Sequence, residues 1–240
     1  MPPRQPHLKV EFALWSAGKR YVVGVDEVGA GPLCGPVVAA AVLVKPHTRK
    51  IKGVRDSKTL SAAQRERVVE QIKERALAWG IGAASVAEIE RLNIRNAAAL
   101  AMRRALRPLP PYDHVLIDGQ KITGIEEHIG PYTPIVKGDA SSYAIACASV
   151  LAKVTRDRLM ANLAVRYPGY GWEHNAGYAT RDHVAGLRAH GVSPHHRRTF
   201  QRIRGILEGD QLSFELGGEP VAEPAARDQE VEAQAEISTG

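Results

Sequence analysis

Two valine-rich runs separated by a short turn constrain the fold of this chain more than any other feature. The first run is YVVGVDEV (residues 21–28), the second is VVAAAVLV (residues 37–44), and the intervening GAGPLCGP supplies the glycines and prolines of a turn. Runs rich in β-branched residues favour strands, and two strands joined by a short turn form an antiparallel hairpin. The sequence therefore predicts a hairpin at the start of a β-sheet.

Strand-like and helical segments alternate after this hairpin. We expect helices over residues 61–79, 93–106, 141–166, 180–190 and 193–207, a short helix over 8–17, and strands over 80–87, 114–118 and 132–137. A hairpin followed by alternating strands and helices implies an α/β fold with a mixed sheet. The last helices are expected to form a small C-terminal helical extension of one compact body.

The charge of the chain is divided between two regions. Residues 208–240 contain nine acidic residues and one basic residue, a net charge of −8, whereas the rest of the chain carries +14. Hydrophobic periodicity also ends near residue 210, so we predict an N-terminal segment (1–20), a main domain (21–207) and a disordered acidic tail (208–240). A basic body favours a polyanionic partner, nucleic acid first, although a solvated basic surface would give the same composition.

The two cysteines, Cys34 and Cys147, stand among small apolar residues, which predicts buried and reduced thiols. The sequence contains no apolar run of about 18 residues, and its start, MPPRQPHLKV, lacks the apolar core of a secretory signal. We therefore expect a cytoplasmic protein with no membrane segment.

Several carboxylates stand where strands should be buried or should end. Asp26 and Glu27 interrupt the first valine run, Asp118 closes the run HVLID, and Asp157 lies in the predicted long helix. A buried carboxylate needs a partner, and Mg²⁺ is a hard cation that prefers oxygen ligands. Two such ions about 3.5–4 Å apart would support in-line phosphodiester hydrolysis. On spacing alone, Asp118 as a turn residue and Asp157 as a solvated helix charge remain open alternatives.

Other catalytic motifs are missing from the sequence. Gly29-Ala30-Gly31 lacks the third glycine of a dinucleotide-binding fingerprint because Cys34 stands in its place, and no Walker lysine, HExxH or GxSxG motif occurs. The nine histidines show no metal-ligand spacing. These absences leave the acids as the main candidates for chemistry.

Six segments, taken in order, resemble the motifs of the ribonuclease HII family, the type-two ribonucleases H. They are GVDEVGAGPLCGPVVAAAV, DSKTLS (56–61), IDG (117–119), KGDASSYAIACASVLAKVTRD (137–157), GYATRDH (177–183) and HRRTF (196–200). Each motif is weak alone, but six in order are specific, and the likeness runs from about residue 21 to residue 200. The resemblance implies a ribonuclease H-like fold with a mixed five-stranded sheet flanked by helices, which would make residues 21–207 a catalytic domain.

The resemblance also implies an activity. A protein of this family cleaves the RNA strand of RNA–DNA hybrids and incises 5′ of ribonucleotides embedded in duplex DNA, the first step of ribonucleotide excision repair. The products carry 5′-phosphate and 3′-hydroxyl ends. By motif, Asp26, Glu27, Asp118 and Asp157 would be catalytic and would hold two Mg²⁺ or Mn²⁺ ions. We expect a monomer that needs no obligate protein partner.

The family pattern further assigns substrate contacts. A loop, here Gly29, Ala30 and Gly31, would read the 2′-hydroxyl through its backbone, and Tyr178 would pack on the neighbouring sugar. The expected phosphate contacts are Lys58, Lys137, Lys153 and Arg197, although Lys153 could instead pair with the acids.

Two residues depart from the family pattern. Ala30 stands where the loop usually has arginine, and Ala176 where the C-terminal signature usually has lysine. A backbone readout survives both changes, but lost phosphate contacts should weaken affinity. They motivate an alternative of another class, a hybrid-binding protein with weakened catalysis. The hairpin would also suit a Holliday-junction nuclease or a sugar-kinase-like ATPase. The long fourth motif and the absence of phosphate-loop signatures favour a ribonuclease of the HII type over both.

Overall fold

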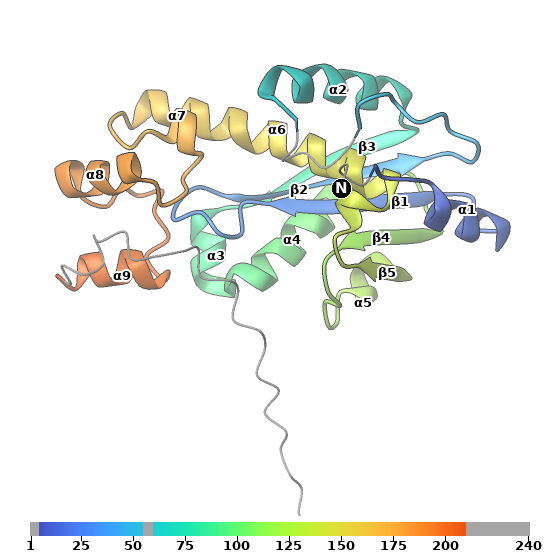
Figure 1. The fold of residues 1–240 in the computed structure, drawn as a ribbon. Coiled ribbons are helices and arrows are strands. Elements are labelled where there is room, and N and C mark those ends of the chain that lie inside the picture. The colour runs from blue at the N-terminus through green and yellow to red at the C-terminus, as the bar shows by residue number, and fades with distance from the viewer. Residues whose placement is uncertain (1–4, 55–59, 210–240) are drawn as a thin grey trace, which may run out of the picture.

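The computed structural model describes residues 5–54 and 60–209. Its strands are β1 (Val22–Val28), β2 (Val37–Val44), β3 (Ala78–Ala84), β4 (His114–Asp118) and β5 (Tyr132–Ile135). Its helices are α1 (Lys9–Ser16), α2 (Ala62–Arg75), α3 (Val86–Leu92), α4 (Ile94–Leu106), α5 (Glu126–Ile129), α6 (Tyr143–Arg166), α7 (Trp172–Asn175), α8 (Arg181–His190) and α9 (Gln201–Leu207), with a short 3-10 helix, η2 (Gly138–Ala140). Figure 1 shows a sheet with helices on both sides.

The five strands form one mixed sheet in the order β3-β2-β1-β4-β5. β2 pairs antiparallel with both β1 and β3, whereas β4 pairs parallel with β1 and with β5. The predicted hairpin and the predicted mixed five-stranded sheet are therefore confirmed. Because β1 and β4 are adjacent and run in the same direction, their carboxyl ends lie side by side, where sites in such sheets gather.

Helices cover both faces of the sheet. In Figure 1, α2 and α6 lie above the sheet, α3, α4 and α5 lie below it, and α7, α8 and α9 extend from the end opposite α1. One core cluster packs α2 and α6 against the upper face, with Val42 and Leu151 among its members. A second cluster packs α4 against the lower face, with Val25 and Met102 among its members. The predicted helical extension packs through a third cluster, which joins Trp172 to residues of α6 and of the loop between β1 and β2.

Helix α6 approaches β1 closely at Gly24. A Cβ atom placed there would lie 2.1 Å from the carbonyl carbon of Ala144 and 2.4 Å from the amide nitrogen of Ile145. No side chain fits at such distances, because protein interiors are already close-packed. The glycine before Asp26 therefore lets the first turns of α6 lie directly on the strand that carries the acids.

Most expected elements are confirmed, and the differences lie mainly at their ends. Ser61 caps α2 as predicted, because its Oγ accepts a hydrogen bond from the Gln64 backbone N–H at 3.2 Å in a reciprocal capping box. The helix ends at Arg75 and does not continue to Trp79, because residues 78–84 pair with β2 as the edge strand β3.

Two corrections concern short segments. The strand expected over residues 80–87 ends at Ala84, and a separate helix, α3, begins after Ser85 in a second capping box. Residues 193–200 are not helical, and α9 begins only at Gln201. In place of a helix, backbone hydrogen bonds join this segment to the loop between β1 and β2, for example from Arg197 N–H to the Leu33 carbonyl at 2.9 Å.

Both cysteines are buried, as expected. Burial raises the pKa of the Cys34 thiol and of the Cys147 thiol to about 12, so both stay protonated. Within residues 5–54 and 60–209, no helix is long and apolar enough to cross a membrane. The predicted acidic tail lies outside the described residues from 210 onward.

Candidate active site

Asp26 and Asp118 lie at the carboxyl ends of neighbouring parallel strands. The register of β1 and β4 pairs Val25 with Ile117, and the two aspartates follow directly after this pair. Glu27 comes next in β1, and its backbone N–H donates to Asp26 Oδ1 at 2.8 Å. The structure therefore brings together three of the four acids predicted from the sequence.

The Asp26 carboxyl group is buried among other acids. Its residue is 6% exposed. Burial, followed by the charges of Glu27, Asp118 and Asp139, raises the pKa of Asp26 well above its usual value, against a smaller lowering by a hydrogen bond with Ser149. A carboxylate in this position lacks the positive charge that would stabilise its ionised form, and a bound cation would supply it.

Asp139 belongs to this cluster and was missed by the sequence reasoning. It lies in η2, just after β5, and is 8% exposed. The neighbouring Gly138 backbone N–H donates to Asp118 Oδ1 at 2.7 Å, so the same turn also holds Asp118 in place. Asp118 was singled out as the acid that ends a short strand, whereas Asp139 follows the end of β5 by four residues, so including acids just after a strand would have found it.

Asp157 is paired with two cations. Its Oδ1 lies 2.8 Å from Lys153 Nζ, and its Oδ2 lies 3.5 Å from Arg65 Nη2. It stands eight residues, or about 12 Å of helix rise, beyond Ser149, the α6 residue that hydrogen-bonds Asp26. Lys153 therefore takes the second of its two expected roles and pairs with an acid. In the described part of the chain, no three of the four predicted acids have ligand oxygens within 4.8 Å of one another.

A buried arginine holds the loop between β1 and β2 through the carbonyl groups of the loop. Arg197 is 0% exposed and donates to the carbonyl oxygens of Gly29, Ala30 and Gly35 at 2.5–3.1 Å. Burial and the nearby Arg156 guanidinium lower the pKa of Arg197 to about 9, which still leaves it charged at neutral pH. The expected phosphate contact of Arg197 is therefore corrected to a structural one, because its donors face the loop backbone and not the surface.

A second buried arginine joins this loop to the C-terminal signature. Arg156 of α6 donates to the Pro36 carbonyl at 3.0 Å and to the Ala176 carbonyl at 2.9 Å. Gly29 has a left-handed φ of 96°, and a Cβ atom there would lie 2.2 Å from Arg156 Nε, so glycine is required. Ala176 also adopts a left-handed φ, of 47°, which is unfavourable for alanine.

Tyr178 lies beside the loop, at the surface. It is 46% exposed, and a Cβ atom on Gly31 would lie 3.9 Å from its Cε1. Lys137 is also exposed and directly precedes Gly138, the residue that hydrogen-bonds Asp118. The remaining predicted contact, Lys58, lies outside the described residues.

Two buried histidines fix the backbone of Tyr178. The Ser193 backbone N–H donates to His196 Nδ1 at 2.9 Å, so the proton of this ring is on Nε2, which lies 3.0 Å from His183 Nε2. His183 Nδ1 donates in turn to the Tyr178 carbonyl at 2.9 Å. Burial lowers the pKa of both rings, that of His196 to about 3, so the pair is neutral.

Among the described residues, one group of three possible metal ligands from His, Cys, Asp or Glu has its ligand atoms within 4.8 Å of one another. It consists of the same two histidines and Cys34. Sequence spacing could not reveal it, because 149 and 13 residues separate its members. His196 Nε2 already carries a proton, His183 Nε2 accepts from Trp172 Nε1 at 3.1 Å, and the Cys34 thiol is protonated. The arrangement therefore favours a hydrogen-bonded packing cluster over a metal centre.

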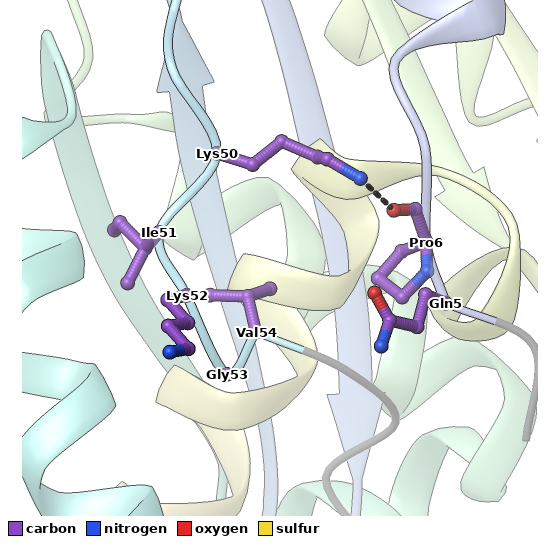
Figure 2. Close-up of a pocket in the computed structure, with 7 residues that line it drawn as sticks. All are labelled: Gln5, Pro6, Lys50, Ile51, Lys52, Gly53 and Val54. Atoms are coloured by element: carbon purple, nitrogen blue, oxygen red, sulfur yellow. Dashed lines mark hydrogen bonds between the residues drawn. The ribbon is translucent and has the colours of Figure 1, made fainter.

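A surface pocket lies elsewhere in the molecule, next to the N-terminal segment (Figure 2). Its lining residues are Gln5, Pro6, Lys50, Ile51, Lys52, Gly53 and Val54. None of these is a predicted site residue, so the pocket shares no residue with the acidic cluster.

Known proteins resemble this chain in sequence and in fold. The sequence profile of the family described as Ribonuclease HII matches residues 23–204. The chain belongs to the ribonuclease HII family. It is 53% identical over 201 residues to the ribonuclease HII of Thermosynechococcus vestitus (strain NIES-2133 / IAM M-273 / BP-1), covering 83% of this chain and 92% of the relative. It is 48% identical over 216 residues to the ribonuclease HII of Synechococcus sp. (strain JA-3-3Ab), covering 89% of this chain and 94% of the relative.

Solved structures of this family and of a related one have the same fold. The ribonuclease H2 from Pyrococcus horikoshii OT3 matches with a TM-score of 0.68 at 25% identity, over 79% of this chain and 98% of that one. Bst-RNase HIII in complex with Mn²⁺ matches with a TM-score of 0.65 at 23% identity, over 85% and 75% of the two chains. The predicted ribonuclease H-like fold is confirmed. Membership of ribonuclease HII makes the chain a metal-dependent nuclease, a hydrolase that acts on RNA–DNA hybrids.

Proposed function

We propose that this chain is an endonuclease that cuts the RNA strand of RNA–DNA hybrids and also incises 5′ of ribonucleotides embedded in duplex DNA. The products would carry 5′-phosphate and 3′-hydroxyl ends. One observation carries the proposal: Asp26 and Asp118 lie where adjacent parallel strands end, with Glu27 and Asp139 close by, and burial together with these charges raises the pKa of Asp26. A cluster of acids around a buried carboxyl group suits a metal-dependent phosphodiester hydrolase.

The residues present fit hard divalent cations. The donors are carboxylate oxygens, which Mg²⁺ and Mn²⁺ prefer, and their mutual repulsion would be relieved by bound positive charge. Asp26, Glu27, Asp118 and Asp157 would hold two such ions, with Asp139 close by. Two ions would activate the attacking water and stabilise the leaving oxygen. The inclusion of Asp157, which is ion-paired with Lys153, rests on the family resemblance.

The hydrogen bonds beneath the loop support our proposal that its backbone recognises a 2′-hydroxyl. The carbonyl oxygens of Gly29 and Ala30 point at Arg197. In a trans peptide the N–H group points opposite to the carbonyl of the same unit, so the N–H groups of Ala30 and Gly31 point away from the buried guanidinium. These groups would meet the 2′-hydroxyl, and the exposed ring of Tyr178 would pack on the neighbouring sugar.

Phosphate contacts would come from exposed basic residues. Lys137 is exposed next to the acidic cluster and would contact the phosphate backbone. Lys58 is proposed for the same role from the family motif alone. The two alanines at positions 30 and 176 remove two family cations, so we expect weaker and less salt-dependent binding than in relatives that keep them.

The alternative of a hybrid-binding protein with weakened catalysis rests on the same two alanines. A cleavage assay distinguishes the two: a duplex with one embedded ribonucleotide is incubated with Mg²⁺ or Mn²⁺, beside an all-DNA duplex and a matched hybrid. We expect the wild type to cut the first substrate once, 5′ of the ribonucleotide, and Asp118→Asn to be inactive. Tight hybrid binding by the wild type, without cleavage above the Asp118→Asn level in either metal, would support the alternative.

A further inference from the structure

Glu11 is a buried carboxylate on α1, outside the residues that the family profile matches. It is 0% exposed, and its Oε1 accepts hydrogen bonds from Ser142 Oγ at 2.7 Å and from the Ala144 backbone N–H at 2.9 Å. The Ala144 amide lies in the first turn of α6, where N–H groups have no partner within the helix and where negative charge is favourable. Glu11 therefore caps α6 from a separate helix.

Hydrogen bonds continue from this cap to a predicted metal ligand. The Ser142 backbone N–H donates to the Gly138 carbonyl at 2.7 Å, and the Gly138 N–H donates to Asp118 Oδ1 at 2.7 Å. Asp139 of the acidic cluster lies on the turn that these bonds define. Three consecutive residue contacts thus connect Glu11 to Asp118.

The chain before α1 is itself fixed in place. The His7 backbone N–H donates to the Ser141 carbonyl at 3.2 Å, and the His7 carbonyl accepts from the Tyr143 N–H at 3.1 Å. Figure 2 shows Lys50 reaching across to the same segment, where its Nζ donates to the Pro6 carbonyl at 3.1 Å. The N-terminal segment is therefore a fixed support behind residues 138–144.

We propose that Glu11 is a positioning residue for the acidic site: through Ser142 and Gly138 it sets the orientation of the Asp118 carboxylate and the place of Asp139. This inference rests on the proposed function in one respect, the assignment of Asp118 as a metal ligand. Within the described residues, Glu11 Oε2 has no hydrogen-bond partner, so the support acts through Oε1 alone.

The test compares Glu11→Ala, which removes the acceptor, with Glu11→Gln, which keeps one neutral acceptor. Glu70→Gln is the matched control, because the Glu70 side chain is 66% exposed on α2. Mn²⁺ affinity is measured by titration calorimetry, and exchange of the Gly138 amide hydrogen is measured by NMR, both well below the unfolding temperature. Outer partners of metal ligands typically contribute about 10–100-fold to affinity, and Glu11 acts two contacts beyond Gly138, the outer partner of Asp118.

We expect Glu11→Ala to weaken Mn²⁺ binding by about 5–10-fold and to speed hydrogen exchange at the Gly138 amide. Glu11→Gln should give values between those of Glu11→Ala and the wild type. Glu70→Gln should match the wild type. Wild-type Mn²⁺ affinity and Gly138 exchange in both Glu11 variants, with only a lower unfolding temperature, would overturn the proposal. If Glu11→Ala does not fold, Glu11→Gln decides by the same two measurements. A wild type that binds Mn²⁺ but cuts no duplex would refute the proposed function and leave the positioning test valid.

Discussion

Arg197 is a buried arginine that holds the β1–β2 loop through hydrogen bonds to its carbonyl groups, and its replacement tests that role. Replacing Arg197 by methionine, which has similar length, removes every hydrogen bond from its guanidinium to the carbonyls of Gly29, Ala30 and Gly35. The Gly29 and Gly35 residues are buried, so their carbonyls would lose their partner without gaining water. A buried polar group left without a partner costs about 1–3 kcal/mol, so the two together cost about 4 kcal/mol.

That loss should be visible in both stability and specificity. For a domain of this size, about 4 kcal/mol lowers the unfolding temperature by about 8–16 °C. A loosened loop should also hold its N–H groups less well against the 2′-hydroxyl, so discrimination between ribonucleotide-containing and all-DNA duplexes should fall by about 10-fold or more. Calorimetry and single-turnover cleavage of the two substrates measure these effects.

Arg198→Met is the matched control, because Arg198 is adjacent in sequence and exposed. We expect it to leave the unfolding temperature within about 2 °C of the wild type, since exposed substitutions usually cost less than about 0.5 kcal/mol. The reasoning is refuted if Arg197→Met unfolds with the wild type and instead lowers the salt dependence of binding by about 0.9 in log–log slope, which is the signature of a lost phosphate contact.

Three further variants test Asp26 and the two alanines. Asp26→Asn should reduce cleavage by more than about 100-fold, because Asp26 is a proposed metal ligand and outer partners alone contribute about 10–100-fold. Burial and neighbouring acids raise the pKa of Asp26, so the stabilisation present at low pH is lost as pH rises through that folded-state pKa. The variant should therefore gain stability over the wild type as pH rises above about 4, measured as unfolding temperature against pH. Ala176→Gly should raise stability by about 0.5–1 kcal/mol in denaturant unfolding because φ is left-handed there, whereas Ala179→Gly, at an ordinary φ, should lower it. Ala30→Arg should steepen the salt dependence of duplex binding by about 0.9 if its guanidinium reaches one phosphate, and an unchanged slope would place position 30 away from the phosphate path.

Local patterns were enough to predict much of the fold. The valine runs around Asp26 and Glu27 defined the hairpin, and Ser61 marked the start of α2. The same patterns placed Asp118 at a strand end beside them, because parallel strands bring their carboxyl ends together. These features depend on residues near one another in sequence, where propensity and capping act directly.

Features set by distant contacts could not be predicted in this way. HRRTF reads as a polar surface segment, yet Arg197 is buried because its guanidinium matches carbonyls that lie more than 160 residues earlier. Helix α2 ends at Arg75 because pairing with β2 outweighs the helical pattern that continues to Trp79. Asp139 was not singled out from the sequence, because its proximity to Asp26 arises only where η2 follows β5 in the folded chain.

Cleavage of a duplex that contains a single ribonucleotide tests the central claim most directly. The substrate is labelled at its 5′ end, the metal is Mg²⁺ or Mn²⁺, and the fragments are mapped at single-nucleotide resolution. We expect the wild type to make one incision, 5′ of the ribonucleotide, and to leave a 3′-hydroxyl on the upstream fragment. We expect no cut by Asp118→Asn. No incision above that variant, or equal cutting of an all-DNA duplex, would contradict it.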